Sequence, residues 1–577
     1  MIILFAVDKI PGLHLRATSE AEEMGMDLFE MAETLDEFGN DYEMFFRENA
    51  SKLRAILDHY EDHVEVLEGR SISEGSVSRV HHVNGEKLFS LDERRLQEVE
   101  QERRLEDGSN FINKIGLMVN AEIRGVERVP EDKRFDRNWT SPLTLFLSPN
   151  LAISALSTGM MGPTYYSLDF KTCVICGVLV PIVSAIPVGC YAVFGAKFGL
   201  RQQILSRYFT GNIMGRIFAF FNVISCIGWN AINVLPAVQM LVSLGKLPPW
   251  AGCLIFVVIT CIMAFFGYKV IHVYERWSWI PNLIVYFIMI ARMVKAKKFV
   301  WEAHDGSKVE AGNVLSYITT IFGFVAGWSP SAADYFVYMP SDTSPLKICS
   351  AMVVGMSVPC IFTLVLGSAF AMGTKSDESW NQAFEDNSVG GLVNKILVED
   401  SLHGFGKFCV VILAMSAIAN NLPGSYSLAL ATQAIWSKLA RFPRLGWCVI
   451  GNFVSLALSI PAYYVFADTM TNFLSIIGYN VSIYIGITLA EHCVYRKGFK
   501  GYDVTNFNDI STLPVGIAGI IGFLFGVMST VLSMNQTWYV GVIARKILGD
   551  ISFELNIVIA FIGYNLARPF ELKYLGR

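Results

Sequence analysis

The sequence predicts an all-α integral membrane protein with twelve transmembrane helices, arranged as two inverted repeats of five helices followed by two C-terminal helices. Three observations predict this class. Of the 577 residues, 53% are hydrophobic and only 17% are charged, whereas soluble domains carry roughly 25% charged residues. Long apolar segments follow one another from about residue 141. Two of these segments, five apart in order, are interrupted by Gly, Ser and Pro.

An acidic extension precedes the apolar part. Residues 1–137 hold 31 acidic and 18 basic residues, a net charge of −13, and the remainder holds 20 acidic and 28 basic residues, a net of +8. We expect residues 1–137 to form a cytosolic extension that is partly helical or disordered, and residues 138–577 to form the membrane domain. The N-terminal MIILFAVDKI has no basic region before its apolar run, so it is not a convincing signal peptide.

Twelve segments are long enough to cross roughly 30 Å of hydrocarbon, which needs about 20 residues each. They lie near 141–163, 170–195, 214–241, 250–267, 270–294, 313–338, 347–372, 405–433, 443–464, 469–492, 513–533 and 552–568. The last of these is the least distinct, because 536–549 is also partly apolar.

Lys and Arg in the short loops predict that both termini are cytoplasmic. The loops that would lie inside carry Lys197, Arg201, Arg207, Lys438, Arg441, Arg444, Arg496, Lys497 and Lys500. The loop near 373–404, expected outside, is acidic, with DESWNQAFEDN. A basic group after the fifth segment disagrees with this orientation; it consists of Arg292, Lys295, Lys297 and Lys298.

The two interrupted segments are the first and the sixth. They contain SPNLAISALSTGMMGP (148–163) and GFVAGWSPSAADYFVYMP (323–340). Backbone that leaves the helix in lipid must be buried in protein or line a cavity, and a matched pair of broken segments is the sequence signature of a transporter site. Kinks in packed membrane helices are the alternative, but a matched pair with polar residues beside each break favours the site.

Tryptophans and carboxamides mark three segments. Trp229 and Asn233, in CIGWNAINVL, share one helix face because they are four residues apart. Trp328 lies at the break of the sixth segment. AMSAIANNLPGSYSLAL in the eighth segment contributes the four residues Asn420, Asn421, Pro423 and Gly424. Indoles offer flat stacking faces and carboxamides offer donors and acceptors, so the expected ligand is a small, planar, uncharged heterocycle. A packing Trp with an interhelical Asn remains the alternative for the Trp229 and Asn233 pair.

Candidates for a coupling-ion site are Asp334, Glu275 and Ser416. An acid within a membrane segment is a functional candidate by default. The alternative is that both acids lie at the cytoplasmic helix ends and bond to backbone or to a nearby Arg. A sodium site between the first and eighth helices would need hydroxyls, and MSAIAN offers only Ser416. Proton coupling is therefore favoured over sodium.

Other classes of function find little support. All 11 cysteines lie at or beyond Cys173, most of them in apolar runs, and the Cys173–Cys176 pair has no polar partner pair nearby. The membrane segments hold no nucleophile–base pair or metal set, which argues against an enzyme. We expect no metal, no cofactor and no nucleic-acid partner.

Several long motifs, in order, resemble the fungal purine-cytosine permease family of nucleobase–cation symporters. These motifs are GLRQQILSRYFTG, CIGWNAINVL, PPWAG, AFFGYKVIHVYERWSWIPN, GWSPSAADYFVYMP and ANNLPGSYSLAL. The resemblance covers about residues 121–577. It implies a LeuT-like fold in the plasma membrane and uptake driven by protons. It also implies substrate contacts at Ser154 or Ala155, and at Trp229, Asn233, Trp328, Asn420, Asn421 and Pro423.

One departure from the family bears on specificity. Relatives typically read ANNxPN in the eighth helix, where this chain has Gly424 after Pro423. In relatives the missing Asn looks like a direct substrate contact, so its loss puts recognition of cytosine and purines in question. Vitamin B6 carriers also belong to the family and vary at this site. A vitamin B6 importer is thus the alternative substrate class, and a non-transporting nutrient sensor is the alternative of another class. The sequence identifies neither the ligand nor the oligomeric state.

Overall fold

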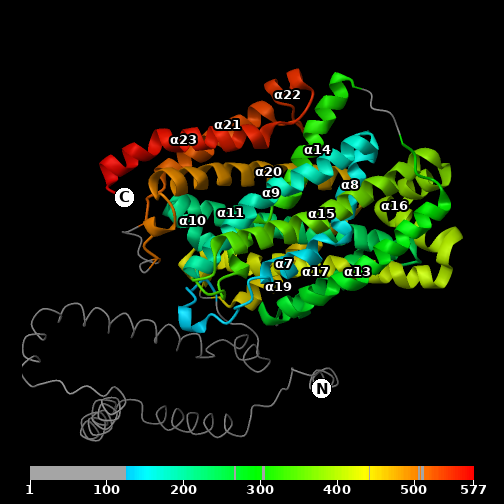
Figure 1. Ribbon diagram of the computed structural model, residues 1–577, viewed down its shortest axis with the longest axis horizontal. Coiled ribbons are helices and arrows are strands. Elements are labelled where there is room, and N and C mark those ends of the chain that lie inside the picture. Colours follow the sequence, from blue (N-terminus) through cyan, green and yellow to red (C-terminus); the bar gives the residue numbers. More distant parts are fainter. Residues whose placement is uncertain (1–124, 266–267, 302–305, 441, 505–506, 508–512) are drawn as a thin grey trace, which may run out of the picture. The chain divides into compact units, whose positions relative to one another are not determined.

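The structure is a computed structural model that describes residues 125–265, 268–301, 306–440, 442–504, 507 and 513–577. Figure 1 shows these residues as a bundle of helices, most of which run alongside one another. Within these ranges the chain forms helices and no named β-strand, and an isolated bridge joins Asn535 and Val540. Of the expected acidic extension 1–137, residues 1–124 lie outside the described residues.

Each apolar segment expected from the sequence contains helix. In chain order these helices are α7 (Ser141–Asn150), α8 (Ile153–Thr164), α9 (Phe170–Phe198), α11 (Asn212–Ser243), α12 (Pro249–Phe265), α13 (Tyr268–Ala296), α14 (Lys308–Ala326), η2 (Ser329–Tyr335), α15 (Pro345–Ser376), α17 (His403–Ile435), α19 (Arg444–Ala462), α20 (Phe466–Ala490), α21 (Ile517–Ser533) and α23 (Ser552–Leu575). The remaining elements lie before or between them, namely η1 (Glu131–Lys133), α10 (Gln202–Thr210), α16 (Glu378–Leu397), η3 (Val398–Leu402), α18 (Ser437–Ala440), η4 (Tyr463–Val465), η5 (Glu491–Tyr495), η6 (Phe499–Gly501) and α22 (Val542–Ile547).

Seven helical stretches in the described part of the chain are long and apolar enough to cross a membrane. One of them, Arg444–Tyr495, includes both α19 and α20. The bent pair α7 and α8 makes an eighth if it is counted as one span, whereas α12 and α21 are shorter apolar helices. The protein is therefore an all-helical, multi-pass membrane protein.

The predicted break in the first segment is confirmed. The chain bends by 56° between α7 and α8, next to Pro149, whose ring removes a backbone donor. Neighbouring helices bind the backbone groups freed by the bend: Ile153 N donates to Ser416 Oγ of α17 (3.0 Å), and Asn150 O accepts from Thr363 Oγ1 of α15 (3.1 Å). The break is thus stabilised inside the protein, as backbone at membrane depth requires.

In the sixth segment the helix changes type without the sharp bend of the first, and Lys308–Tyr335 counts as one membrane-length stretch. Helix α14 ends at Ala326, and the chain continues as the buried 3-10 helix η2, with Pro330 in its first turn. Tyr335 Oη, at the end of η2, donates to the carbonyl oxygen of Pro423 in α17 (2.8 Å). Both interrupted segments therefore form hydrogen bonds with α17, and α17 itself stays helical through Pro423.

The described residues before α7 pack against the bundle. Arg134 is buried and donates through Nη1 to Ala196 O at the end of α9 (2.7 Å), while Val129 N donates to Gly199 O (2.9 Å). Gly199 has a φ of +63°, and a Cβ there would lie 2.5 Å from Val129 O. A glycine is needed at this corner for both reasons, so the segment fits closely over the turn between α9 and α10.

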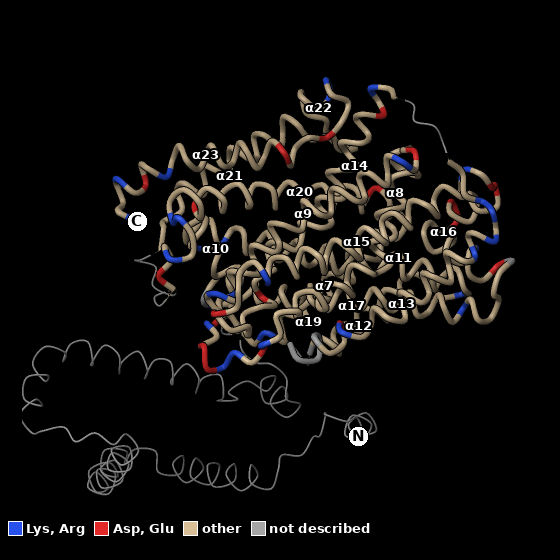
Figure 2. The backbone as a smooth tube through the Cα atoms, viewed as in Figure 1, with Lys and Arg blue, Asp and Glu red and all other residues tan. Residues whose placement is uncertain are grey.

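Charged residues gather at the ends of the bundle, and the middle of the long helices carries few of them (Figure 2). Lys298, from the basic group that disagreed with the orientation rule, donates to Asp377 at the start of α16. This contact with Lys298 holds the pKa of Asp377 at about 2. Lys298 is thus paired with the acidic segment 373–404, which was expected as a loop and of which Glu378–Leu397 forms helix α16.

Candidate substrate site

A small internal cavity lies between α11, the α14–η2 break and α17. Its volume is about 30 Å³, so its walls lie close together. The residues that line it are Asn222, Ser225, Cys226, Trp229, Asn233, Phe324, Gly327, Trp328, Ser331, Asn420 and Gly424. Five of the eight substrate residues proposed from the sequence are among them, contributed by three separate segments: Trp229, Asn233, Trp328, Asn420 and Gly424.

Aromatic contacts fix the orientation of both indoles. The ring of Trp229 packs edge to face against Phe324 of α14 (5.7 Å between centroids) and Phe473 of α20 (5.4 Å). The ring of Trp328 packs the same way against Phe146 of α7 (5.2 Å). Such edge-to-face pairs are favourable and directional. Each indole is thus oriented by a phenylalanine from a distant helix: Phe473 of α20 packs against Trp229, and Phe146 of α7 packs against Trp328.

Asn420 joins three elements at the cavity. Its Nδ2 donates to Ser154 Oγ of α8 (2.7 Å) and to Asn233 Oδ1 of α11 (3.4 Å). Ser154 is buried and does not line the cavity; its hydroxyl positions Asn420 from behind. The alternative first-helix position, Ala155, is fully buried and does not line the cavity either.

Asn421 and Pro423 point elsewhere. Asn421 Nδ2 donates to the backbone carbonyl of Asn230 in α11 (2.9 Å), and the carbonyl of Pro423 accepts from Tyr335. Neither residue lines the cavity. Both residues therefore take part in hydrogen bonds that hold α17 against α11 and η2.

Asp334 lies at the N-terminus of α10. Its carboxylate accepts from Gln202 N (2.7 Å) and from Ser427 Oγ (2.9 Å), and its backbone carbonyl accepts from Arg201 Nη1 (2.7 Å). A carboxylate at a helix N-terminus accepts hydrogen bonds from the free N–H groups, and its negative charge is stabilised by the positive end of the helix dipole. Each of these contacts is a structural one, so Asp334 is a weaker ion-site candidate than its position in the sequence indicated.

Glu275 is the contrasting acid. It is fully buried on α13, with Ser148 of α7 beside its carboxyl group, and neither carboxyl oxygen has a regular hydrogen bond to any described residue. Ser148 lies just before the break between α7 and α8. Ser416, the third candidate, accepts from Ile153 N and donates to Leu413 O (2.6 Å), so its hydroxyl is already engaged at the start of α8.

Several residues of α11 that line the cavity were not expected from the sequence. Asn222, Cys226, Trp229 and Asn233 follow one another at intervals of four, three and four residues, with Ser225 beside them. This spacing puts them on one face of a helix. The polar face was therefore readable from the sequence, but only Trp229 and Asn233 were chosen from it.

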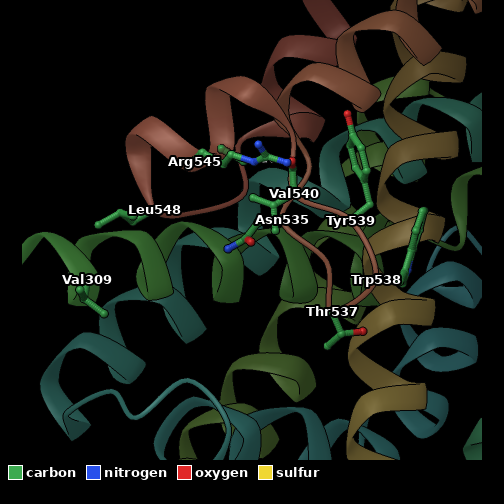
Figure 3. A pocket seen from close by; sticks show the side chains of 9 residues that line it. Val309, Asn535, Thr537, Trp538, Tyr539, Val540, Arg545 and Leu548 are labelled. Atoms are coloured by element: carbon green, nitrogen blue, oxygen red, sulfur yellow. Dashed lines mark hydrogen bonds between the residues drawn. The ribbon is translucent and has the colours of Figure 1, made fainter.

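A larger recess of about 620 Å³ lies at another place in the bundle, between the start of α14 and the loop that leads to α22. Figure 3 shows Val309 on one wall and Asn535, Val540 and Arg545 on the other. Arg545 Nε donates to the carbonyl of Val540 (3.1 Å), and Trp538 is 63% exposed. This open recess does not have the paired indoles and amides of the internal cavity.

The chain matches a family model described as permease for cytosine/purines, uracil, thiamine, allantoin over residues 128–544. It is 44% identical to purine-cytosine permease FCY21 of Saccharomyces cerevisiae over 81% of this chain and 90% of the relative. It is 38% identical to purine-cytosine permease fcyB of Emericella nidulans (81% and 92%), and 24% identical to vitamin B6 transporter TPN1 of Saccharomyces cerevisiae (82% and 92%).

Solved structures share the fold. The nucleobase-cation-symport-1 family transporter Mhp1, in a closed conformation with bromovinylhydantoin bound, aligns with a TM-score of 0.59 at 13% identity, over 79% of this chain and 95% of that one. An inward facing conformation of Mhp1 aligns with a TM-score of 0.60 at 12% identity, over 78% and 96%. At these identities the likeness concerns the fold alone.

Proposed function

Because this chain belongs to the family of permeases for cytosine and purines, uracil, thiamine and allantoin, we propose that it is a secondary active transporter that imports nucleobases, or a related planar N-heterocycle, together with protons. The family consists of permeases, so the protein is a transporter and not an enzyme. Cytosine and purines are the proposed substrates, because relatives at 38–44% identity over four-fifths of the chain are named purine-cytosine permeases.

The composition of the cavity wall carries the proposal. The described residues that line it contribute two indoles, carboxamides and hydroxyls, and no charged side chain. A carboxylate or ammonium substrate would need a counter-charge in such a buried place, whereas a flat uncharged ring needs stacking faces and hydrogen bonds at its edge. The substrate sites proposed from the sequence are retained here, with Trp229, Trp328, Asn233, Asn420 and Gly424 as direct contacts and Ser154 as the group that positions Asn420.

The proposed mechanism is alternating access. It uses twelve transmembrane helices, with helices 1–5 and 6–10 as inverted repeats in a LeuT-like arrangement and two trailing helices. The two broken helices support this proposal, since paired breaks are typical of such transporters. The closely spaced walls of the cavity fit a closed state, from which the walls must separate to admit a ring. The proposed location is the plasma membrane, with both termini cytoplasmic.

Protons are the proposed coupling ion, with Glu275 as the residue that carries the proton. Its carboxyl group is buried without a regular hydrogen bond and lies beside the first broken helix. A buried acid is more stable when it is neutral, so proton binding and release at this place is linked to how α7 and α13 pack. The carboxylate of Asp334 and the hydroxyl of Ser416 are already engaged in hydrogen bonds within the protein. Glu275 is therefore favoured over both as the proton carrier.

Uptake of radiolabelled cytosine, adenine, guanine, hypoxanthine and pyridoxine tests the function, in cells that lack their own carriers for these compounds. We expect uptake of cytosine or purines that rises as external pH falls and persists without sodium. Surface-localised protein that takes up none of the five compounds would rule the proposal out. Uptake of pyridoxine alone would favour the vitamin B6 alternative, for which the 24% identical relative and Gly424 are the arguments.

A nutrient sensor is the alternative of another class. A sensor would bind a labelled nucleobase without accumulating it, and deletion of residues 1–110 would abolish its signalling. A transporter with the same deletion should retain uptake, because every proposed substrate residue lies at or beyond Ser154.

A further inference from the structure

Two arginines lie close together where α10 meets α11. Arg207, in the last turn of α10, packs against the first turn of α11, since a Cβ at Gly215 would lie 3.0 Å from Arg207 Cα. Arg216 is the next residue on α11. Burial and the positive charge of Arg216 lower the pKa of Arg207 to about 10. Two like charges at short range disfavour each other, so this corner is stabilised by any negative charge placed beside it.

The described residues supply no acidic partner for this pair. Arg207 Nη2 donates to the backbone carbonyl of Ala434 at the end of α17 (2.8 Å). The Nε groups of Arg207 and Arg216 are buried, and neither has a hydrogen-bond partner among the described residues. Buried donors in folded proteins are almost always paired, and the planar guanidinium fork matches the oxygens of a carboxylate or a phosphate. The pair therefore indicates an anionic ligand with more than one oxygen.

The surface of α11 beside Arg216 is apolar and exposed. It carries a stripe at intervals of four, three and four residues, between 36% and 50% exposed, which consists of Ile213, Ile217, Phe220 and Ile224. This spacing puts the four side chains on one face of the helix, and Arg216 lies one turn before Phe220. An exposed apolar surface of this kind on a membrane helix faces lipid chains. The arginine pair thus lies at one end of a lipid-facing stripe.

This corner belongs to the end of the bundle that holds the C-terminus (Figure 1). Asn212 N, at the start of α11, donates to Pro514 O (2.8 Å), and Gly516 N donates to Glu571 Oε1 in the last part of α23 (2.8 Å). In the proposed orientation this end is cytoplasmic. The cytoplasmic leaflet carries anionic lipids, which attract Lys and Arg near the membrane surface.

An exposed tryptophan next to the corner indicates the level of the lipid headgroups. Trp436 follows two residues after Ala434, the residue that Arg207 contacts, and it is 52% exposed. Lys438 Nζ lies 5.1 Å from the centre of its ring. Tryptophan is enriched at the boundary between lipid and water, so Arg207 lies close to that boundary.

We infer that Arg207 and Arg216 form a binding site for the headgroup of an anionic phospholipid, whose acyl chains lie along the exposed stripe of α11. The two guanidiniums donate to the phosphate oxygens, and the negative charge of the lipid offsets the repulsion between them. Binding therefore stabilises the packing of α10 against α11 and α17. The assignment to the inner leaflet rests on the proposed orientation, whereas the site itself does not depend on which substrate is carried.

Titration with phosphatidylserine tests the site. The full-length protein is held in micelles of detergent and phosphatidylcholine, and its melting temperature is followed as phosphatidylserine is added. A ligand that binds the folded state raises the melting temperature, so phosphatidylserine should raise it and further phosphatidylcholine should not. Arg216→Gln should weaken the apparent affinity for phosphatidylserine by about fivefold, the effect of one basic residue at an anionic membrane surface.

The sign of the effect without anionic lipid separates a lipid site from a purely structural role. Arg216→Gln removes the like charge beside Arg207, so with phosphatidylcholine alone the variant should melt at or above the temperature of the unmodified protein. With phosphatidylserine the order should reverse. A residue needed only for the fold would instead lower the melting temperature in both lipids, and that result overturns the inference.

Arg137→Gln is the matched control, because Arg137 is exposed and belongs to the segment that packs over the turn between α9 and α10. It removes the same charge outside the pair and should leave the affinity for phosphatidylserine unchanged. Equal stabilisation of the unmodified protein by both lipids, or equal loss of affinity in Arg216→Gln and Arg137→Gln, contradicts the site. Glycerophosphoserine, which has the headgroup without acyl chains, should stabilise the protein less; an equal effect would show a site for a free phosphate and not for a lipid.

Discussion

Asn420 and Asn421 are neighbours in the sequence, yet their side chains have different surroundings. Successive residues on a helix point about 100° apart, so the two side chains meet different neighbours. Asn420 lines it and bonds to Ser154 and Asn233, while Asn421 bonds to the backbone of Asn230. The sequence showed that two amides in an apolar helix need partners, but which one faces the cavity depends on how α17 is rotated against α11.

Substitution of the two asparagines should separate these roles. Asn420→Ala should raise the KM for nucleobase uptake with little change in the amount of protein at the membrane. Asn421→Ala removes a buried hydrogen bond between α17 and α11, worth about 0.5–1.5 kcal/mol, and should lower the melting temperature of the purified protein. The measurements are uptake kinetics and thermal unfolding in detergent. Equal effects of both substitutions on KM would contradict this assignment.

The two indoles should each be required for uptake. Stacking of a base on an aromatic ring is worth about 1–3 kcal/mol, so Trp229→Ala or Trp328→Ala should weaken binding by about five- to 150-fold. Trp250→Ala is the matched control, since Trp250 lies on α12 and is 56% exposed. Uptake is measured at equal surface abundance. Normal uptake by both cavity variants would place the substrate elsewhere.

At the scale of elements, the two broken helices were predictable from the sequence because Gly, Ser and Pro stand where a continuous apolar helix would need none. The partners of the freed backbone were not predictable. Ser416 and Thr363, which bind the backbone at the first break, come from α17 and α15, more than 200 residues away. Long-range partners of this kind are set by helix packing, which local sequence does not encode.

The contact between α14 and α20 depends on a glycine. A Cβ at Gly323 would lie 1.9 Å from the backbone carbonyl of Leu474, and backbone cannot move aside as a flexible side chain can. Gly323→Ala should therefore force the two helices apart at a cost of about 1–3 kcal/mol or more. The expected result is less folded protein in size-exclusion chromatography.

Gly245→Ala serves as the control for this substitution, because nothing lies within 4 Å of the added Cβ. A melting temperature of Gly323→Ala equal to that of the control would show that α14 and α20 are less closely packed than described.

At the scale of the whole molecule, coupling requires that proton binding and the ligand cavity favour the same conformation. Glu275 contacts the first broken helix from α13, and Asn420 contacts the same broken helix through Ser154. Both groups therefore act on the α7–α8 segment, from opposite sides of its break. This arrangement is the physical link that we propose between the proton and the substrate.

Glu275→Gln tests this link. Glutamine imitates the permanently protonated acid, so the variant should exchange labelled for unlabelled substrate across the membrane but fail to accumulate it against a gradient. Its uptake should also lose the rise that we expect as external pH falls from 8 to 5. Asp334→Asn is the comparison: it weakens the cap of α10 and should lower protein abundance without removing pH dependence. Accumulation by Glu275→Gln equal to that of the unmodified protein would exclude the acid as the coupling site.

The sequence by itself determined that this protein is an all-helical membrane protein with two interrupted segments, and it predicted tryptophans and carboxamides as the contacts of a flat ligand. Those features are local, since apolar length, helix-breaking residues and the spacing of Trp229 and Asn233 can each be read within one segment. The tertiary structure alone decided that Asn420 lines the cavity while Asn421 does not, and that Asp334 caps a helix while Glu275 has no regular hydrogen bond to a described residue. The physical reason is that hydrogen bonding and burial depend on the rotation and register of helices far apart in the chain, which only their mutual packing fixes.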